Sequence, residues 1–137
     1  MKIVLDTNVL VSGIFWTGVP YKILEYWSHG CFDLLVTEDI LKEFERTLFK
    51  LSKGKNAQLV SNWLNLIAEN SLLVSVGKKY RLSNDPDDDK FIDCAIAGKA
   101  LYIISGDADL LDIGMVMGIS IIGPSEFIRK IRGQVKQ

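Results

Sequence analysis

Two aspartates directly follow short apolar runs of the chain. Asp6 comes after residues 2–5, and Asp107 comes after residues 101–104 and the step Ser105-Gly106. Continuous Val/Ile/Leu runs are typical of strands that are buried on both faces of a parallel sheet. Because the carboxyl ends of parallel strands meet at one edge, we expect both carboxylates there, where open α/β sheets bind ligands. Each aspartate could instead serve only as the N-cap of a following helix.

A third acidic stretch, residues 84–89, opens a predicted helix. The helix dipole favours acids in a first turn, so the cluster alone needs no functional explanation. Asp88, however, lies on the core-facing stripe of this helix, with Phe91, Ile92 and Ala95. A carboxylate there is costly unless a positive group meets it, and no Lys or Arg shares the stripe nearby. The spacing therefore favours a metal ion as the partner of Asp88.

Helical spacing does not decide whether Glu43 takes part in such a site. In the predicted helix 38–51, Glu43 flanks the apolar stripe on one side and Glu45 flanks it on the other. From the residues alone, either glutamate could be a solvated surface acid.

Several converging carboxylates are suited to binding a hard cation. Oxygen ligands select Mg²⁺ or Mn²⁺, and such an ion can polarise a phosphodiester and activate water. The same acids could instead serve phosphoryl transfer through an aspartyl nucleophile. Enzymes of that class use paired acids or Asp-x-Asp after the first strand, whereas this chain has Asp6-Thr7-Asn8. A non-catalytic binding module with the same fold is the other alternative.

The apolar runs alternate with helical patterns, which predicts an α/β fold. Strands are expected at residues 2–5, 32–36, 72–76, 101–104 and 119–122, and helices at 9–15, 21–28, 38–51, 57–70, 87–100 and 126–131. Right-handed crossovers place helices on both faces of the sheet. We therefore predict a single domain, residues 1–137, built as a three-layer α/β/α sandwich with a mainly parallel five-stranded sheet.

The composition excludes several classes of protein. With 137 residues, of which 48% are hydrophobic and 24% charged, the chain is that of an ordinary globular protein. A formal net charge of −1 argues against a protein that coats DNA or membrane through bulk charge. Two Cys and one His are too few for a structural zinc site, and no apolar run is long enough to span a membrane. We expect a cytoplasmic protein with reduced thiols.

Four segments resemble the motifs of PIN-domain proteins in order and spacing. They are residues 6–10 (DTNVL), 37–44 (TEDILKEF), 85–91 (DPDDDKF) and 105–111 (SGDADLL), and together they extend over almost the whole chain. The chain is most similar to the subgroup of toxins from toxin–antitoxin pairs that are related to VapC. The resemblance implies a flap-endonuclease-like fold and a metal-dependent ribonuclease that cuts single-stranded or structured RNA. It also implies a cognate antitoxin protein and a homodimer.

The resemblance also assigns roles to individual residues. The implied catalytic acids are Asp6, Glu43, Asp88 and Asp107. Asp6, Asp88 and Asp107 would hold Mg²⁺, or Mn²⁺ in its place, and Glu43 would orient water or complete the site. Asn8 and Ser105 would hold the aspartates by hydrogen bonds, with Asp109 as an accessory acid. Water would attack the scissile phosphate in line, leaving a 5′-phosphate and a 3′-hydroxyl. The chain departs from the subgroup at Asp89, where Asn is common.

Basic and aromatic side chains allow two interpretations each. Lys78, Lys79 and Arg81, which precede the third motif, could bind substrate phosphates or be solvated surface charges. The same holds for the lysines of residues 50–55. The aromatic residues of segment 15–27 could stack on bases, but their helical spacing favours a core or a protein interface.

Overall fold

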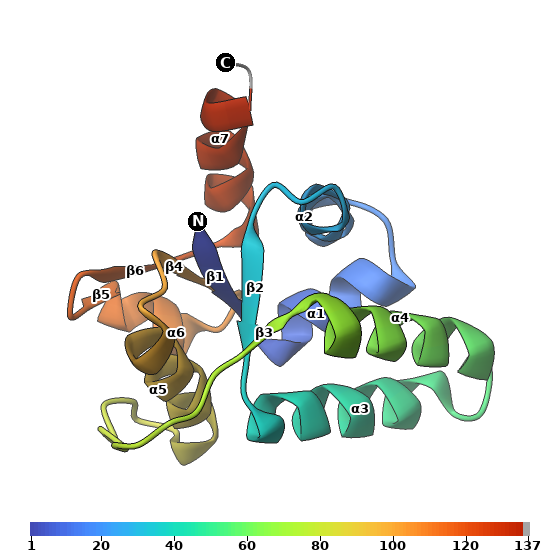
Figure 1. Ribbon diagram of the computed structural model, residues 1–137, viewed down its shortest axis with the longest axis horizontal. Coiled ribbons are helices and arrows are strands. Elements are labelled where there is room, and N and C mark those ends of the chain that lie inside the picture. The colour runs from blue at the N-terminus through green and yellow to red at the C-terminus, as the bar shows by residue number, and fades with distance from the viewer. Residues whose placement is uncertain (136–137) are drawn as a thin grey trace.

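A six-stranded sheet forms the centre of the computed structural model, which describes residues 1–135 (Figure 1). The strands, in chain order, are β1 (Lys2–Leu5), β2 (Asp33–Val36), β3 (Leu72–Leu73), β4 (Tyr102–Ile104), β5 (Met115–Val116) and β6 (Ile119–Ile122). Their order across the sheet is β3-β2-β1-β4-β6-β5, and all neighbours are parallel except β5 and β6. The predicted mainly parallel sheet is therefore confirmed.

The predicted number of five strands was one too low, because β5 was missed. This strand has two residues and pairs with β6 in an antiparallel hairpin. The turn consists of Met117 and Gly118, both with positive φ, as a two-residue hairpin requires. A strand so short contains no period of alternation, so the sequence pattern could not indicate it.

Seven α-helices and one 3₁₀ helix are found within the described residues. They are α1 (Thr7–Phe15), α2 (Val19–Ser28), α3 (Glu38–Ser52), α4 (Ala57–Asn70), η1 (Pro86–Asp88), α5 (Asp89–Gly98), α6 (Ala108–Ile113) and α7 (Pro124–Val135). The short helix α6 was not predicted. The acidic stretch expected to start a helix at residue 87 instead forms η1, and α5 begins two residues later.

The helices cover both faces of the sheet. In Figure 1, helices α1 to α4 lie on one side of β1 and β2, and α5 and α6 lie on the other side. Helices α3 and α4 pack against each other as a helical hairpin. Helix α7 packs against α2, and its Phe127 meets the rings of Phe32 and Tyr102 edge-on. Within the described residues, none of these helices combines the length and apolarity that a membrane crossing needs.

The order of strands reverses at β1, and this reversal positions the acidic residues. The chain proceeds from β1 outward to β2 and β3, then returns through α5 to β4 on the other side of β1. Leu5 of β1 lies level with Ile104 of β4, and the N–H of Asp6 donates to the carbonyl of Ile104 at 3.0 Å. The segments that follow β1 and β4 thus start side by side and diverge. Such a switch point creates a crevice at the carboxyl edge of a parallel sheet.

The two strands that end at this edge of the sheet, β1 and β4, are buried in the core. Ile3, Val4 and Leu5 are at most 1% exposed, and Ile103 and Ile104 of the adjacent strand are completely buried. Strands buried on both faces explain the continuous apolar runs in the sequence.

Candidate active site

Asp6 lies at the start of α1 and is 5% exposed. Its Oδ1 accepts a hydrogen bond from the N–H of Val9 at 2.9 Å, so it is the N-cap of the helix. Its Oδ2 accepts a hydrogen bond from the hydroxyl of Ser105. Burial raises the pKa of Asp6 above its usual range, against the lowering effect of these hydrogen bonds, and the nearby charge of Asp107 raises it further. Capping therefore accounts for only one of its two oxygens.

Ser105 connects the ends of the two central strands. The side chain is completely buried, and its hydroxyl donates to Asp6 while accepting from the N–H of Asp107 at 2.9 Å. Asp107 in turn caps α6, because its Oδ1 accepts from the N–H of Asp109 at 3.0 Å. One buried hydroxyl thus fixes Asp6 and Asp107 relative to each other.

Asp88, the last residue of η1, brings a further carboxylate close to that of Asp107. One carboxylate oxygen from each of Asp88, Asp107 and Asp109 lies within 4.8 Å of the other two. Burial raises the pKa of Asp88 to about 7, and a hydrogen bond to Asp107 and the charges of Asp107, Asp85 and Asp6 act in the same direction. These carboxylates repel one another and would be stabilised by a cation.

The donor set of this cluster fits a divalent metal ion. Asp88 Oδ2 is buried and has no hydrogen-bond partner among the described residues. A buried carboxylate oxygen without a donor is costly, and an ion would supply the missing partner. Exclusively oxygen ligands in a small cluster are those that Mg²⁺ and Mn²⁺ prefer. Within residues 1–135, the carboxylates that come this close together are those of Asp88, Asp107 and Asp109, and Asp6 is joined to Asp107 through Ser105.

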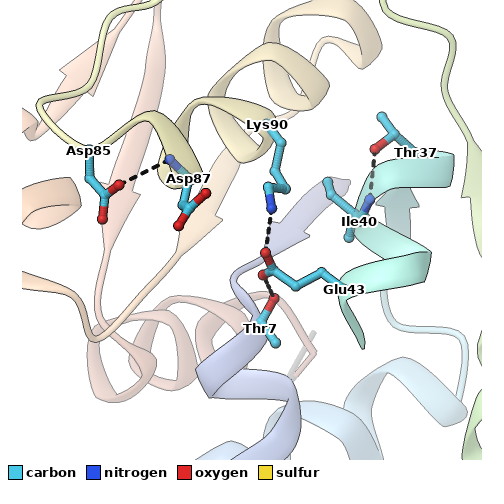
Figure 2. Close-up of polar contacts among 7 residues, drawn as sticks. All are labelled: Thr7, Thr37, Ile40, Glu43, Asp85, Asp87 and Lys90. Carbon is cyan, nitrogen blue, oxygen red and sulfur yellow. Dashed lines mark hydrogen bonds and ion pairs between the residues drawn. The ribbon is translucent and has the colours of Figure 1, made fainter. Parts of the chain in front are cut away.

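Glu43 lies beside these aspartates and outside their cluster. Its half-buried carboxylate accepts a hydrogen bond from the Thr7 hydroxyl and forms an ion pair with Lys90, as Figure 2 shows. Glu45, which spacing alone could not distinguish from Glu43, is exposed. Helix α3 therefore directs Glu43 toward Thr7, the residue after Asp6, and toward the start of α5.

Thr7 and Lys90 are two site residues that the sequence analysis missed. Thr7 directly follows Asp6, and Lys90 follows Asp88 by two residues, so proximity to the acidic motifs was the only available signal. Asn8 was expected to hold the aspartates, but its side chain is exposed and makes no hydrogen bond within residues 1–135. The next residue toward the strand, Thr7, faces the site instead and binds Glu43.

Two other acids of the third motif, and Asp93 just after it, accept hydrogen bonds from the backbone. Asp85 caps η1 by accepting from the N–H of Asp87 at 3.0 Å (Figure 2). Asp89 accepts from the N–H of Ser83 at 2.9 Å. Asp93, which is 5% exposed, accepts from the N–H of Tyr80 at 3.0 Å. Most of this acidic stretch therefore shapes the local chain, and Asp88 alone turns into the cluster.

A sequence model described as the PIN domain matches residues 2–109, a segment that includes every acid of this site. The chain belongs to the PIN domain family. The predicted membership is thus confirmed.

This PIN domain resembles two further proteins in sequence or fold. The uncharacterized protein MJ1680 of Methanocaldococcus jannaschii is 32% identical over 117 residues, which are 82% of this chain and 75% of that protein. A chain in the crystal structure of VapBC2 from Rickettsia felis, bound to a DNA fragment from their promoter, superposes with a TM-score of 0.61. It shares 16% sequence identity, and the match covers 90% of this chain and 98% of that chain. The PIN-like fold that the sequence predicted is therefore confirmed.

The geometry of this PIN domain separates two groups of charge. The aspartate cluster can hold a divalent cation, and its members come from η1, from the N-cap of α6 and from the first turn of α6. The Glu43–Lys90 pair joins α3 to α5 beside that cluster. A phosphate brought between the two groups would meet a cation on one side and an ammonium on the other. This combination is suited to chemistry on a phosphodiester.

Proposed function

We propose that this PIN domain is a divalent-metal-dependent endoribonuclease that hydrolyses phosphodiester bonds in single-stranded or structured RNA. The observation that carries the proposal is the buried Asp88 Oδ2, without a hydrogen-bond partner within residues 1–135, in a cluster of carboxylates at the switch point of the sheet. A cation at this place would satisfy that oxygen and relieve the repulsion between the acids. Membership of the PIN domain family agrees with this activity.

Each residue of the site has a role in this proposal. Asp88, Asp107 and Asp109 would hold Mg²⁺ or Mn²⁺, and Asp6, whose charge acts on Asp88, would add negative charge beside the same ion. When bound, such an ion polarises the phosphate and lowers the pKa of water. Ser105 keeps Asp6 and Asp107 in fixed positions, because its buried hydroxyl bonds to both. The bond to Asp6 restricts the orientation of that carboxylate, and the bond from the Asp107 N–H holds the backbone of Asp107 in place before substrate arrives.

Glu43 and Lys90 would act on the phosphate side of the reaction. The carboxylate of Glu43 holds the Lys90 ammonium through their ion pair and is itself held by Thr7. Lys90 is therefore positioned to offset negative charge on a phosphate in the transition state. In this arrangement Glu43 orients the positively charged side chain of Lys90, in addition to any contact that Glu43 makes with water.

Cleavage of an end-labelled single-stranded RNA in Mg²⁺, in Mn²⁺ and in EDTA tests the proposed activity. We expect cutting with either metal and none in EDTA, and we expect Asp6→Asn to lose it. Asp33→Asn is the matched control, because Asp33 is an exposed acid at the opposite, amino end of a strand. Folded wild-type protein that binds Mn²⁺ and cuts neither single-stranded nor structured RNA would exclude the nuclease. Absence of Mn²⁺ binding would favour the non-catalytic module.

We further propose that the protein is a cytoplasmic toxin with a cognate antitoxin protein. The similarity in fold to a chain of a VapBC2 complex supports a partner of this kind. A homodimer is supported by large apolar side chains that remain exposed, among them Trp16 and Tyr21 near the α1–α2 junction. Induced expression should arrest bacterial growth in a manner that depends on Asp88, and light scattering should give the mass of a dimer. Unimpaired growth or a monomeric mass would contradict the respective proposal.

A further inference from the structure

A groove of about 700 Å³ runs beside the proposed active site. It is lined by the start of α3, by the segment of residues 73–81 after β3, and by η1 with the first turns of α5. Lys90 lines this groove and also pairs with Glu43, so the groove adjoins the Glu43–Lys90 pair of the site. Two more basic residues, Lys79 and Arg81, lie along its wall.

Arg81 has an unusual backbone conformation that two acids hold in place. Its φ is 53°, in the left-handed region that a residue with a side chain rarely adopts. The preceding N–H, of Tyr80, donates to Asp93, and Ser83 two residues later donates to Asp89. Both acids belong to the rigid helix α5. Arg81 therefore extends from a stretch of chain that these two hydrogen bonds hold on both sides.

The charges in the groove leave Arg81 available for a ligand. Of the four acids that line it, Asp89 and Asp93 already accept backbone hydrogen bonds, and Glu38 and Asp39 lie at the N-terminus of α3, where the helix dipole favours them. Within residues 1–135, Arg81 is exposed and forms no ion pair with any of these acids. An arginine that stays unpaired beside four carboxylates is accessible to an external anion.

Not every basic residue of this segment lines the groove, as Lys78 shows. Its ammonium lies 4.8 Å from the centre of the Tyr80 ring, and Lys78 does not line the groove. The neighbouring Lys79 and Arg81 both line it. Of the basic residues in this segment, Lys79 and Arg81 thus face the groove, whereas Lys78 packs on an aromatic ring.

We propose that Arg81 binds a phosphate of the RNA strand in this groove, next to the phosphate that is cut. The inference rests on the proposed function. Arginine presents a planar fork of donors that can bind two phosphate oxygens at once, and a single strand offers one phosphate per nucleotide. Asp89 and Asp93 are positioning residues in this arrangement, because they fix the chain on both sides of Arg81.

Binding of a fluorescently labelled single-stranded RNA, measured by anisotropy in EDTA, tests Arg81 without cleavage. Arg81→Asn removes the guanidinium but keeps a residue that tolerates positive φ. We expect about tenfold weaker binding, as for loss of one charge-assisted hydrogen bond, and a salt dependence lowered by about one counterion. Lys99→Asn is the matched control: Lys99 is basic, has φ 56° and lies at the far end of α5. It should bind RNA like the wild type.

Two substitutions of Asp89 test its positioning role. Both Asp89→Asn and Asp89→Ala remove one negative charge from the groove, which by itself would strengthen RNA binding. Only Asp89→Ala removes the oxygen that accepts from Ser83. We therefore expect weaker binding for Asp89→Ala and binding at least as tight as wild type for Asp89→Asn. Tighter binding by both variants would overturn the positioning role.

The outcomes separate this inference from the proposed function. Arg81→Asn binding within about twofold of wild type, or no RNA binding by the wild type, overturns the role of Arg81. Cleavage in Mg²⁺ and Mn²⁺ is measured on the same proteins. RNA binding that depends on Arg81 but is followed by no cleavage would support the groove and contradict the nuclease.

Discussion

Asp88→Asn is expected to abolish RNA cleavage and, in EDTA near pH 7, to make the protein more stable than the wild type. Cleavage should fall more than about 100-fold, because even the loss of a hydrogen-bond partner of a metal ligand costs up to that factor. The amide that replaces the carboxylate can bind a divalent cation only weakly, since it is neutral. Asp107 and Asp109 alone would then have to hold the ion.

The gain in stability follows from the electrostatics of the metal-free cluster. The pKa of Asp88 is raised from 3.8 to about 7, mainly by burial and then by Asp107. A carboxyl with a raised pKa in the folded state contributes full stability below its unfolded pKa, and this contribution is lost as the pH rises toward 7. An asparagine never ionises, and its amide can donate to Asp107 as a protonated Asp88 would. Asp88→Asn therefore does not lose stability as the pH rises toward 7.

Thermal unfolding of the two proteins in EDTA, and again with Mn²⁺, checks this prediction. Asp88→Asn should have the higher Tm in EDTA, and Mn²⁺ should raise the Tm of the wild type only, because a ligand stabilises the state that binds it. Asp33→Asn, the acid at the opposite end of the sheet, should change neither value. A lower Tm for Asp88→Asn in EDTA would show that the carboxylate contributes to stability by contacts other than metal binding. A trade of stability for function is common at active sites.

The sequence predicted the central part of the fold well. Continuous apolar runs indicated β1, β2, β4 and β6, because strands buried on both faces require such runs. Strand β5 and helix α6 were missed for a common reason. Two and six residues are too few for a period to be recognised, and tertiary pairing determines their conformation.

The candidate site was predictable where a residue's position in an element determines its environment. Asp6 and Asp107 follow from strand ends, and Asp88 follows from its place among apolar residues. The hydrogen-bond and ion-pair partners of the site acids do not follow from a residue's position in an element, because they depend on how distant segments of the chain pack together. Ser105, which only the family resemblance had assigned to hold the aspartates, is 99 residues from Asp6. Lys90 and Glu43, a pair that no motif indicated, are 47 residues apart. The proximity of Thr7 to Glu43 likewise arises from the packing of α1 on α3, which no local pattern encodes.

The affinity of the site for Mn²⁺ should decrease steeply below about pH 7. A carboxyl must lose its proton before it can bind a cation, so metal and proton compete for Asp88. With its pKa raised to about 7, Asp88 is half protonated near neutral pH and almost fully protonated two units lower. The apparent affinity should therefore fall by a factor that approaches tenfold for each pH unit below about pH 6, or by about 50-fold between about pH 7 and about pH 5. An aspartate with an ordinary pKa near 3.8 would produce almost no change over this range.

Titration calorimetry with Mn²⁺ at several pH values, in the absence of RNA, measures this dependence directly. The wild type should release protons on binding near pH 7, when Asp88 is partly protonated, and the Asp33→Asn control should behave identically. Asp6, whose pKa burial also raises, would steepen the decrease at the acidic end of the range. A flat affinity between about pH 5 and about pH 7 would mean that Asp88 is already ionised in the metal-free protein. Mn²⁺ would then bind without displacing a proton from Asp88, which would contradict the raised pKa of this carboxyl in the metal-free protein.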